Sequence, residues 1–285
     1  MRHFSLILGL LVWLAAAPAL AATGEQDPPP APEAASPSTT DQQAPAPAAT
    51  GQQPPAPDIA PEAAAPVQAM CGLLKSKQSF TFTAEVSSEQ VYPNGQTVQL
   101  TRNVEMAIRR PDKLYARISG DDRDRVFVYD GKTVVVADLD RGVYAMVDAP
   151  PTIDATLDML SDKYDIHAPL ADLLYADPCA VMLQTVRTGD CVGAHTAEGK
   201  TCDHLVFSQK ESDWQLWVEK GKAPLPRKLV INDKQVMGWP QFSATFSQWD
   251  LNPRLPAGLF TFKPQQDARQ IDFMPLVSGQ GETTK

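Results

Sequence analysis

The sequence has few of the residues that enzymes use for catalysis. It contains four histidines in 285 residues, and only His167, His195 and His204 lie after the first 21. None of them forms H-x-x-x-H, H-E-x-x-H or another metal-ligand spacing. No G-x-S-x-G, S-x-x-K or phosphate-binding loop motif occurs. We therefore expect no metal, no cofactor and no catalytic residues, and a protein that is not an enzyme.

Long apolar runs are also missing, because no segment reaches the roughly 20 residues that a membrane-spanning helix needs. The apolar stretch at 4–17 follows Arg2 and precedes Ala19-Leu20-Ala21. A short basic region, a brief apolar core and a small-x-small site are typical of a secretory signal. We expect residues 1–21 to be a signal peptide cleaved after Ala21. The mature protein is then periplasmic and has no transmembrane anchor.

Residues 22–65 lack Phe, Trp, Tyr, Leu and Val and are rich in proline and alanine. Such a segment cannot bury enough apolar surface to offset its ordering entropy, so we expect a disordered leader. It could be a tether, a docking segment for a partner, or simply a solubilising leader. At the other end, residues 277–285 are expected to be a flexible tail.

A strong basic charge is absent as well. The formal net charge is −9, and setting aside Arg2 of the signal and six carboxylates of the leader leaves −4 for the rest. A mildly acidic domain argues against nucleic acid as a partner, and against electrostatic binding to anionic membrane surfaces.

Residues 66–276 are long enough for one domain with a substantial core. Short segments of alternating apolar and polar residues, such as Phe80 to Val86, predict half-buried strands. No helix separates most of them, which indicates an antiparallel sheet. Helical spacing appears near Val67 to Leu74 and again between Thr152 and Leu183, where Thr152 and Asp177 can cap helices.

Some of the expected strands are apolar on both faces, as in 126–129 and 133–136. A sheet of that kind must be covered on both sides or enclose something. A curved sheet with helices on its concave side meets this requirement and leaves an apolar pocket or groove. The predicted fold is therefore α+β, with a strongly curved antiparallel sheet that forms an unclosed barrel.

Several motifs in this domain resemble those of one family. They are Arg110-Pro111-Asp112, Tyr129-Asp130-Gly131-Lys132, the segments 169–174, 202–207 and 213–219, and Gly238-Trp239-Pro240-Gln241-Phe242. In this order they resemble the DUF2092 family of predicted periplasmic proteins. The fold is similar to that of the LolA/LolB-like carriers, and Phe260-Thr261-Phe262-Lys263-Pro264 adds to that likeness. The resemblance implies an unclosed barrel that is lidded by helices and binds the acyl chains of lipoproteins. It implies an architecture rather than an activity.

We therefore expect a non-enzymatic binding or carrier module for an apolar ligand, such as a lipid or a lipoprotein acyl chain. Large apolar and aromatic side chains on the strands are the candidates for contacting it. They are Phe82, Val128, Trp214, Leu216, Trp217, Trp239 and Phe246. Because Trp214 and Trp217 differ by three positions, they should face opposite sides of the sheet. Core filling remains the other interpretation of the tryptophans.

Two other classes of function stay open. An envelope protein-interaction or stress-sensor module would bind a partner through the leader and the sheet edge, and would need no lipid. A hydrolytic enzyme ranks last, because it would require an acid/base pair in a cleft, around Asp172, His167 or His204. His204 is more simply interpreted as a structural residue of a strand.

Four cysteines in an exported chain favour disulfides, and three pairings are possible. Cys191 and Cys202 flank one expected hairpin, which makes their bridge the favoured one. A turn at Glu198-Gly199, however, pairs residues whose numbers sum to about 397. The numbers of Cys191 and Cys202 sum to 393, so these two residues are not directly opposite each other. A bulge would be needed to bring them together. The second candidate bridge joins Cys71 to Cys179.

Overall fold

The computed structural model describes residues 57–274. The expected signal peptide, the tail 277–285 and most of the expected leader lie outside these residues. The end of the leader does not, and here the prediction is wrong. Asp58–Ile59 form a strand and Pro61–Lys75 form a helix, so structure begins before the expected boundary at residue 66. Helix propensity from three alanines and the proline at the first helical turn outweighs the leader-like composition.

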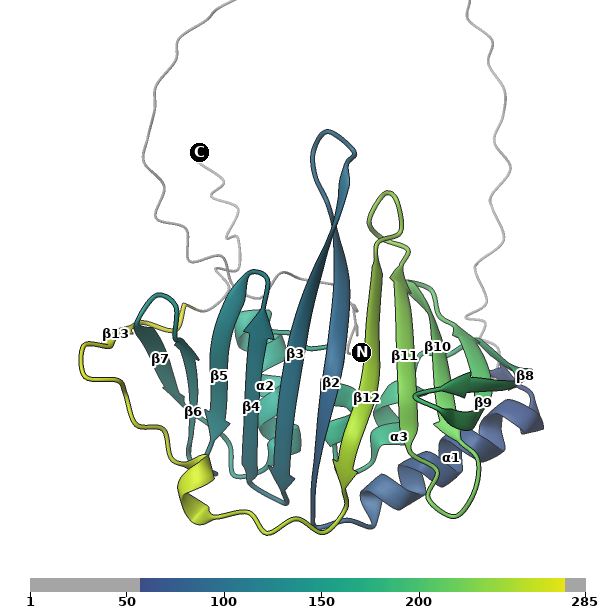
Figure 1. Ribbon diagram of the computed structural model, residues 1–285, viewed down its shortest axis with the longest axis horizontal. Coiled ribbons are helices and arrows are strands. Elements are labelled where there is room, and N and C mark those ends of the chain that lie inside the picture. Colours follow the sequence, from purple (N-terminus) through teal and green to yellow (C-terminus); the bar gives the residue numbers. More distant parts are fainter. Residues whose placement is uncertain (1–56, 275–285) are drawn as a thin grey trace, which may run out of the picture. The chain divides into compact units, whose positions relative to one another are not determined.

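One sheet contains the strands of the described region (Figure 1). They are β1 (Asp58–Ile59), β2 (Ser79–Val91), β3 (Thr97–Arg109), β4 (Lys113–Gly120), β5 (Arg123–Tyr129), β6 (Thr133–Asp138), β7 (Val143–Asp148), β8 (Thr188–Ala197), β9 (Lys200–Ser208), β10 (Ser212–Glu219), β11 (Pro226–Asp233), β12 (Gln241–Asp250) and β13 (Arg269–Ile271). The order is β1-β8-β9-β10-β11-β12-β2-β3-β4-β5-β6-β7-β13. Only the edge pairs β1–β8 and β7–β13 are parallel. Because the order ends in two different edge strands, the sheet is not closed.

Alternation along the strands gives the sheet two different faces. On β2, Phe80, Phe82 and Ala84 are buried in the main core cluster, whereas Thr81 and Thr83 point the other way. We call the side of Phe80 and Phe82 the inner face and the side of Thr81 and Thr83 the outer face. The inner face packs on the helices, which buries its apolar side chains and provides the main stabilisation.

The helices lie on the concave side of the sheet, as the sequence predicts, and Figure 1 draws them behind the strands. They are α1 (Pro61–Lys75), α2 (Ile153–Tyr164), the 3₁₀ turn η1 (Ala171–Leu174) and α3 (Pro178–Met182); a further 3₁₀ turn, η2 (Ala257–Phe260), precedes β13. The expected caps are confirmed, because the Thr152 side chain accepts from Ala155 N and Asp177 accepts from Ala180 N. Within residues 57–274, no helix is both long and apolar enough to cross a membrane.

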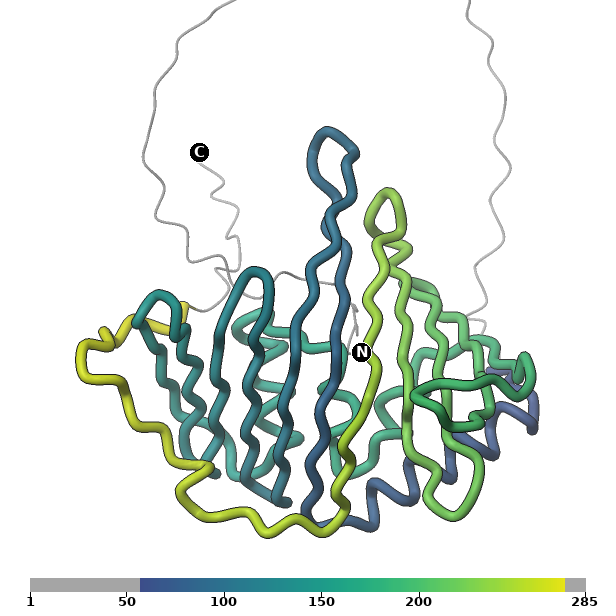
Figure 2. Tube along the Cα trace, in the orientation of Figure 1, coloured from purple at the N-terminus to yellow at the C-terminus, as the bar shows by residue number. Residues whose placement is uncertain are grey.

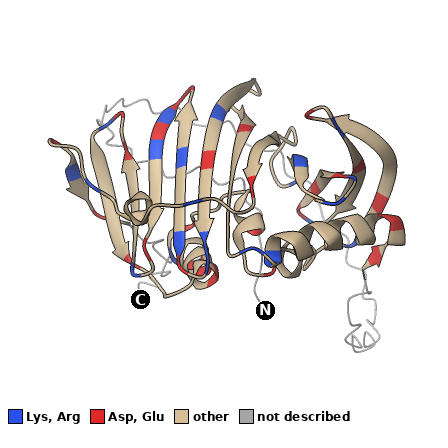
Figure 3. Ribbon diagram, turned by 60° about the horizontal axis from the view of Figure 1, so that its bottom comes forward, with Lys and Arg blue, Asp and Glu red and all other residues tan. Residues whose placement is uncertain are grey.

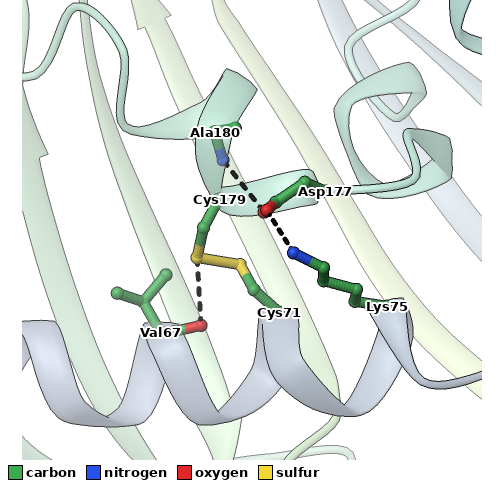
Figure 4. Close-up of a disulfide and its surroundings, with 6 residues drawn as sticks. All are labelled: Val67, Cys71, Lys75, Asp177, Cys179 and Ala180. Atoms are coloured by element: carbon green, nitrogen blue, oxygen red, sulfur yellow. Dashed lines mark hydrogen bonds and ion pairs between the residues drawn. A yellow bond between two sulfur atoms is a disulfide. The ribbon is translucent and has the colours of Figure 1, made fainter.

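The disulfide joins Cys71 of α1 to Cys179 of α3, as Figure 4 shows. The favoured bridge between Cys191 and Cys202 is wrong, since both of these cysteines are free. The hairpin register explains the error. Cys202 is paired with His195, and Cys191 lies across from Leu205 on the other side of a bulge. The predicted sum of 397 is therefore correct for the hairpin, and it keeps the two thiols apart.

Two hairpin turns, β2–β3 and β11–β12, extend past the ends of the neighbouring strands (Figure 2). Trp239 lies in the β11–β12 connection and is 58% exposed, well away from the packed inner face.

Candidate functional site

The structure places four of the seven predicted ligand residues in the core. Phe82, Trp214, Leu216 and Phe246 all lie on the inner face, and each is at most 4% exposed. The rings of Phe82 and Phe246 meet edge to face, with centroids 5.6 Å apart. Such pairs stabilise a packed core. These residues are brought together, but they are sealed by the helices, which agrees with the core-filling interpretation of Trp214.

The other three lie away from the inner face. Val128 is paired with Tyr115 and Val135 on the outer face. Trp217 is also on the outer face, so the prediction that Trp214 and Trp217 face opposite sides is confirmed. Trp239 lies in the exposed connection described above. Val128 and Trp217 therefore do not face the concave side, where the expected ligand would be.

The burial of the inner-face side chains differs between the two halves of the sheet. In the half formed by β4 to β7, Leu114, Tyr129 and Val134 are buried in the core, but some other inward-facing apolar side chains are only partly buried. We define the apolar strip as Ile118 of β4, Phe127 of β5, Val136 of β6 and Val147 of β7. Helix α2, which Figure 1 draws behind β4 and β5, contributes the partly buried Leu157 and Met159. The helices leave this strip incompletely covered.

A row of arginines ends the apolar strip at the end of the sheet that holds the β4–β5 turn. Arg102, Arg123 and Arg125 lie on the inner face, in register with Gly120 and Ile118. Their side chains are only 10%, 9% and 14% exposed. Arginine is rarely buried to this extent without a partner. Sequence analysis missed this row, although Arg102 occupies an inner-face position of the alternation in β3.

The arginine row is held by two carboxylates. Arg102 Nε and Nη2 donate to Asp122 at 2.6 and 3.0 Å, and Arg125 Nε donates to Asp138 at 3.2 Å. Arg123 also donates to Asp122. Burial tends to raise the pKa of Asp122, but the hydrogen bonds from the two arginines outweigh it and lower that pKa. Arg102 and Arg123 thus share Asp122, while Arg125 is paired with Asp138. Figure 3 shows the alternation of acidic and basic residues along the strands.

The outer face has a groove of about 840 Å³ over β12, β2, β3 and β4. Its lining mixes polar residues, among them Glu85, Asn103, Glu105 and Tyr115, with the apolar Leu255 and Leu259, and Glu198 of the β8–β9 turn also contributes. Hydroxyl, amide and carboxylate groups do not suit an apolar ligand. The groove is therefore a separate surface from the apolar strip.

Hydrogen bonds connect Ser161, His167 and Asp165 at the end of α2. Ser161 Oγ lies 3.2 Å from His167 Nδ1, and His167 Nε2 lies 3.0 Å from Asp165 Oδ1. The residue types match a nucleophile, a base and an orienting acid. However, Ser161 is in the last turn of a helix, where carbonyl groups and the negative end of the dipole would oppose an oxyanion. This arrangement is better explained as a cap of the helix end.

Asp172, another residue of the enzyme hypothesis, gives a pH-dependent prediction. Burial raises the pKa of its carboxyl to about 6. A raised carboxyl pKa stabilises the folded state at low pH, and this contribution is lost as pH rises through about 6. Relative to the wild type, Asp172→Asn should therefore gain about 2 kcal/mol of stability between pH 4 and pH 7. Urea unfolding of both proteins at the two pH values measures it, and parallel pH dependences would contradict the assignment.

Among residues 57–274, no group of three or more His, Cys, Asp and Glu side chains is arranged to hold a metal ion.

Sequence comparison gives one family. The model for proteins described as "Predicted periplasmic protein (DUF2092)" matches residues 63–274. No curated protein matches the sequence.

Several solved structures are similar at low identity. The lipoprotein LppX of Mycobacterium tuberculosis is 12% identical, with 68% of this chain and 98% of LppX covered and a TM-score of 0.45. The LolA superfamily protein NE2245 of Nitrosomonas europaea is 11% identical, with 70% and 97% covered and a TM-score of 0.37. The MucA/MucB complex of Pseudomonas aeruginosa is 12% identical, with 71% and 61% covered and a TM-score of 0.38. These likenesses are distant, and none transfers a ligand to this chain.

Proposed function

The chain belongs to the DUF2092 family of predicted periplasmic proteins, and on this premise we propose that it is a non-enzymatic binding or carrier module for an apolar ligand. The ligand class is a lipid or a lipoprotein acyl chain. The observation that supports the proposal is the apolar strip, which faces the concave side of an unclosed sheet and remains only partly buried. The signal peptide cleaved after Ala21 remains part of the proposal.

An acyl chain lying on the strip would complete its burial. Each methylene removed from water contributes about 0.8 kcal/mol, so a chain of several methylenes can offset the cost of ordering it. Phe127 and Val136 are direct strand partners, and they place adjacent apolar side chains across β5 and β6. An apolar surface of this kind is typical of a lipid site.

The arginine row gives the site a polar end. A ligand whose apolar part lies on Phe127 and Val136 would place its other end toward Arg125, one position farther along the inner face of β5. Guanidinium groups bind carboxylate and phosphate groups in a bidentate way. The arrangement therefore supports an amphipathic ligand, with an acyl chain on the strip and an anionic or polar group at the row.

Phe127→Asp tests this placement of the ligand. A carboxylate on the strip must be desolvated when an acyl chain covers it, so we expect lipid occupancy to fall at least about 10-fold. Val126→Asp is the matched control, because Val126 neighbours Phe127 in the chain but points to the outer face. Bound lipid is measured by mass spectrometry after solvent extraction of protein purified from the periplasm.

The two variants separate a ligand effect from a folding effect. Both introduce a carboxylate at a partly buried position of β5, so both should lower stability to a similar degree. Equal lipid occupancy in the two variants would place the ligand elsewhere.

The alternative is an envelope protein-interaction module without a lipid ligand. The groove of the outer face favours it, because Glu85, Glu105 and Glu198 offer carboxylates to a basic segment of a partner. A protein that carries no lipid, and gains none from envelope lipids, would support this alternative.

A further inference from the structure

A pair of histidines meets on the outer face of the β8–β9 hairpin. In the strand register, His195 is paired with Cys202 and His204 with Gly193, so the two imidazoles are diagonal neighbours on one face. Their Nδ1 atoms are 2.9 Å apart. The spacing in the sequence gives no sign of this contact, because it arises only from strand pairing.

A third side chain fixes the orientation of His204. Its Nε2 lies 2.9 Å from Oε1 of Gln215, and an amide oxygen can only accept, so Nε2 carries the proton. Nδ1 of His204 then has a free lone pair and accepts a hydrogen bond from Nδ1–H of His195, a proton that a metal ion would replace. This is the tautomer that leaves Nδ1 of His204 available to a metal ion.

The distance between the two nitrogens suits a metal ion. Imidazole nitrogens bind first-row metals at about 2.0–2.1 Å. Two nitrogens 2.9 Å apart then subtend about 90° at the metal, whereas a tetrahedral ion would need about 3.4 Å. An angle of 90° is that of neighbouring ligands in square-planar or tetragonal copper(II). We propose that His195 and His204 form a two-imidazole site for copper(II), with water or small anions at the other positions.

The residues around the two histidines are compatible with a copper site that has only two protein ligands and is open to solvent. His195 is exposed, so an ion reaches it directly from solvent. Cys202, although opposite His195, is fully buried and its thiol contacts the Lys200 carbonyl, so it is not a third ligand. The ring of Trp217 stacks on the ring of His204, with centroids 3.8 Å apart.

Trp217 provides the readout. Copper(II) is paramagnetic and quenches an indole in contact with its ligand ring. Copper(II) sulfate is titrated into the full chain purified from the periplasm, in a buffer that does not coordinate copper. We expect part of the tryptophan emission to be lost with a sharp end point at one equivalent, and an electron paramagnetic resonance spectrum with two coupled nitrogens.

Variants assign the site. His195→Ala and His204→Ala should each abolish the end point, while His167→Ala, in the loop after α2, should leave it unchanged. Gln215→Leu removes the group that orients His204 and should weaken copper binding about 10-fold or more. An end point that persists in both the His195 and His204 variants, or none in the wild type, would overturn the proposal. Since lipid plays no part in the titration, its outcome is independent of the proposed carrier function.

Discussion

Replacing Arg110 by methionine is expected to lower the free energy of unfolding by about 3 kcal/mol. The Arg110 guanidinium donates to four backbone carbonyls: Leu74 and Lys77 at the end of α1, and Leu174 and Tyr175 at the end of η1. Leu74 O also accepts from Lys77 N, and the partial negative charge of carbonyls at a helical end favours a cation. The guanidinium also lies over the Phe80 ring, 5.2 Å from its centroid. One side chain thus joins two helical ends to β3.

Arg109→Met is the control for this prediction. Arg109 precedes Arg110 on β3, is also partly exposed, and its guanidinium is 5.0 Å from the Phe260 ring. A single cation–π contact at such a position contributes about 0.5–1 kcal/mol. Urea unfolding of both variants measures the difference. Arg110→Lys should recover only part of the loss, because an ammonium group has three donors and no planar fork. Equal losses in the Arg109 and Arg110 methionine variants would show that the carbonyl contacts are not needed.

Removing the disulfide, with Cys71→Ala and Cys179→Ala together, is expected to cost about 4 kcal/mol. The bridge closes a loop of 108 residues, and constraining so long a loop restricts the unfolded chain strongly. Lys75 and Asp177, 2.7 Å apart beside it, form an exposed ion pair that adds little (Figure 4). The disulfide therefore holds α1 to α3 over the inner face.

Reducing agent should lower the unfolding midpoint of the wild type and leave that of the double variant unchanged. Cys191→Ala is the control, since Cys191 is free and partly exposed. It should unfold at nearly the wild-type denaturant concentration, with or without reductant. A wild-type midpoint that does not respond to reductant would contradict the assigned role of the bridge.

The parts of the fold that depend on local chemistry could be predicted from the sequence. The alternation of Phe80 and Phe82 with threonines gives the faces of β2, and the side chains of Thr152 and Asp177 begin α2 and α3. The Glu198-Gly199 turn fixes the register of its hairpin. Each of these signals lies within a few residues of the feature it specifies.

Contacts between distant segments could not be predicted in the same way. The pairing of Cys71 with Cys179 depends on how two helices pack against each other in the folded chain. The bridge between Cys191 and Cys202 was predicted because these residues are close in the sequence, and both are free. The leader boundary was placed too late, because alanine and proline are common both in disordered segments and in a helical first turn.

The ligand residues show a similar limit. Because β5 is apolar on both faces, alternation alone does not say which of Phe127 and Val128 faces the helices. The sequence analysis chose Val128, and the strand register places Phe127 on the inner face instead. Phe82 and Phe246 are buried in the core, whereas the incompletely covered surface is formed by Ile118, Phe127, Val136 and Val147. The arginine row was overlooked because its three members become neighbours only in the sheet.

The carrier function is tested most directly by native mass spectrometry of the full chain, purified from the periplasm without detergent. The account predicts added mass that organic solvent removes and that fragments as a lipid with an acyl chain, with a polar or anionic group. A bare protein mass, unchanged after incubation with envelope lipids, would contradict the carrier function and leave the partner-binding module in its place.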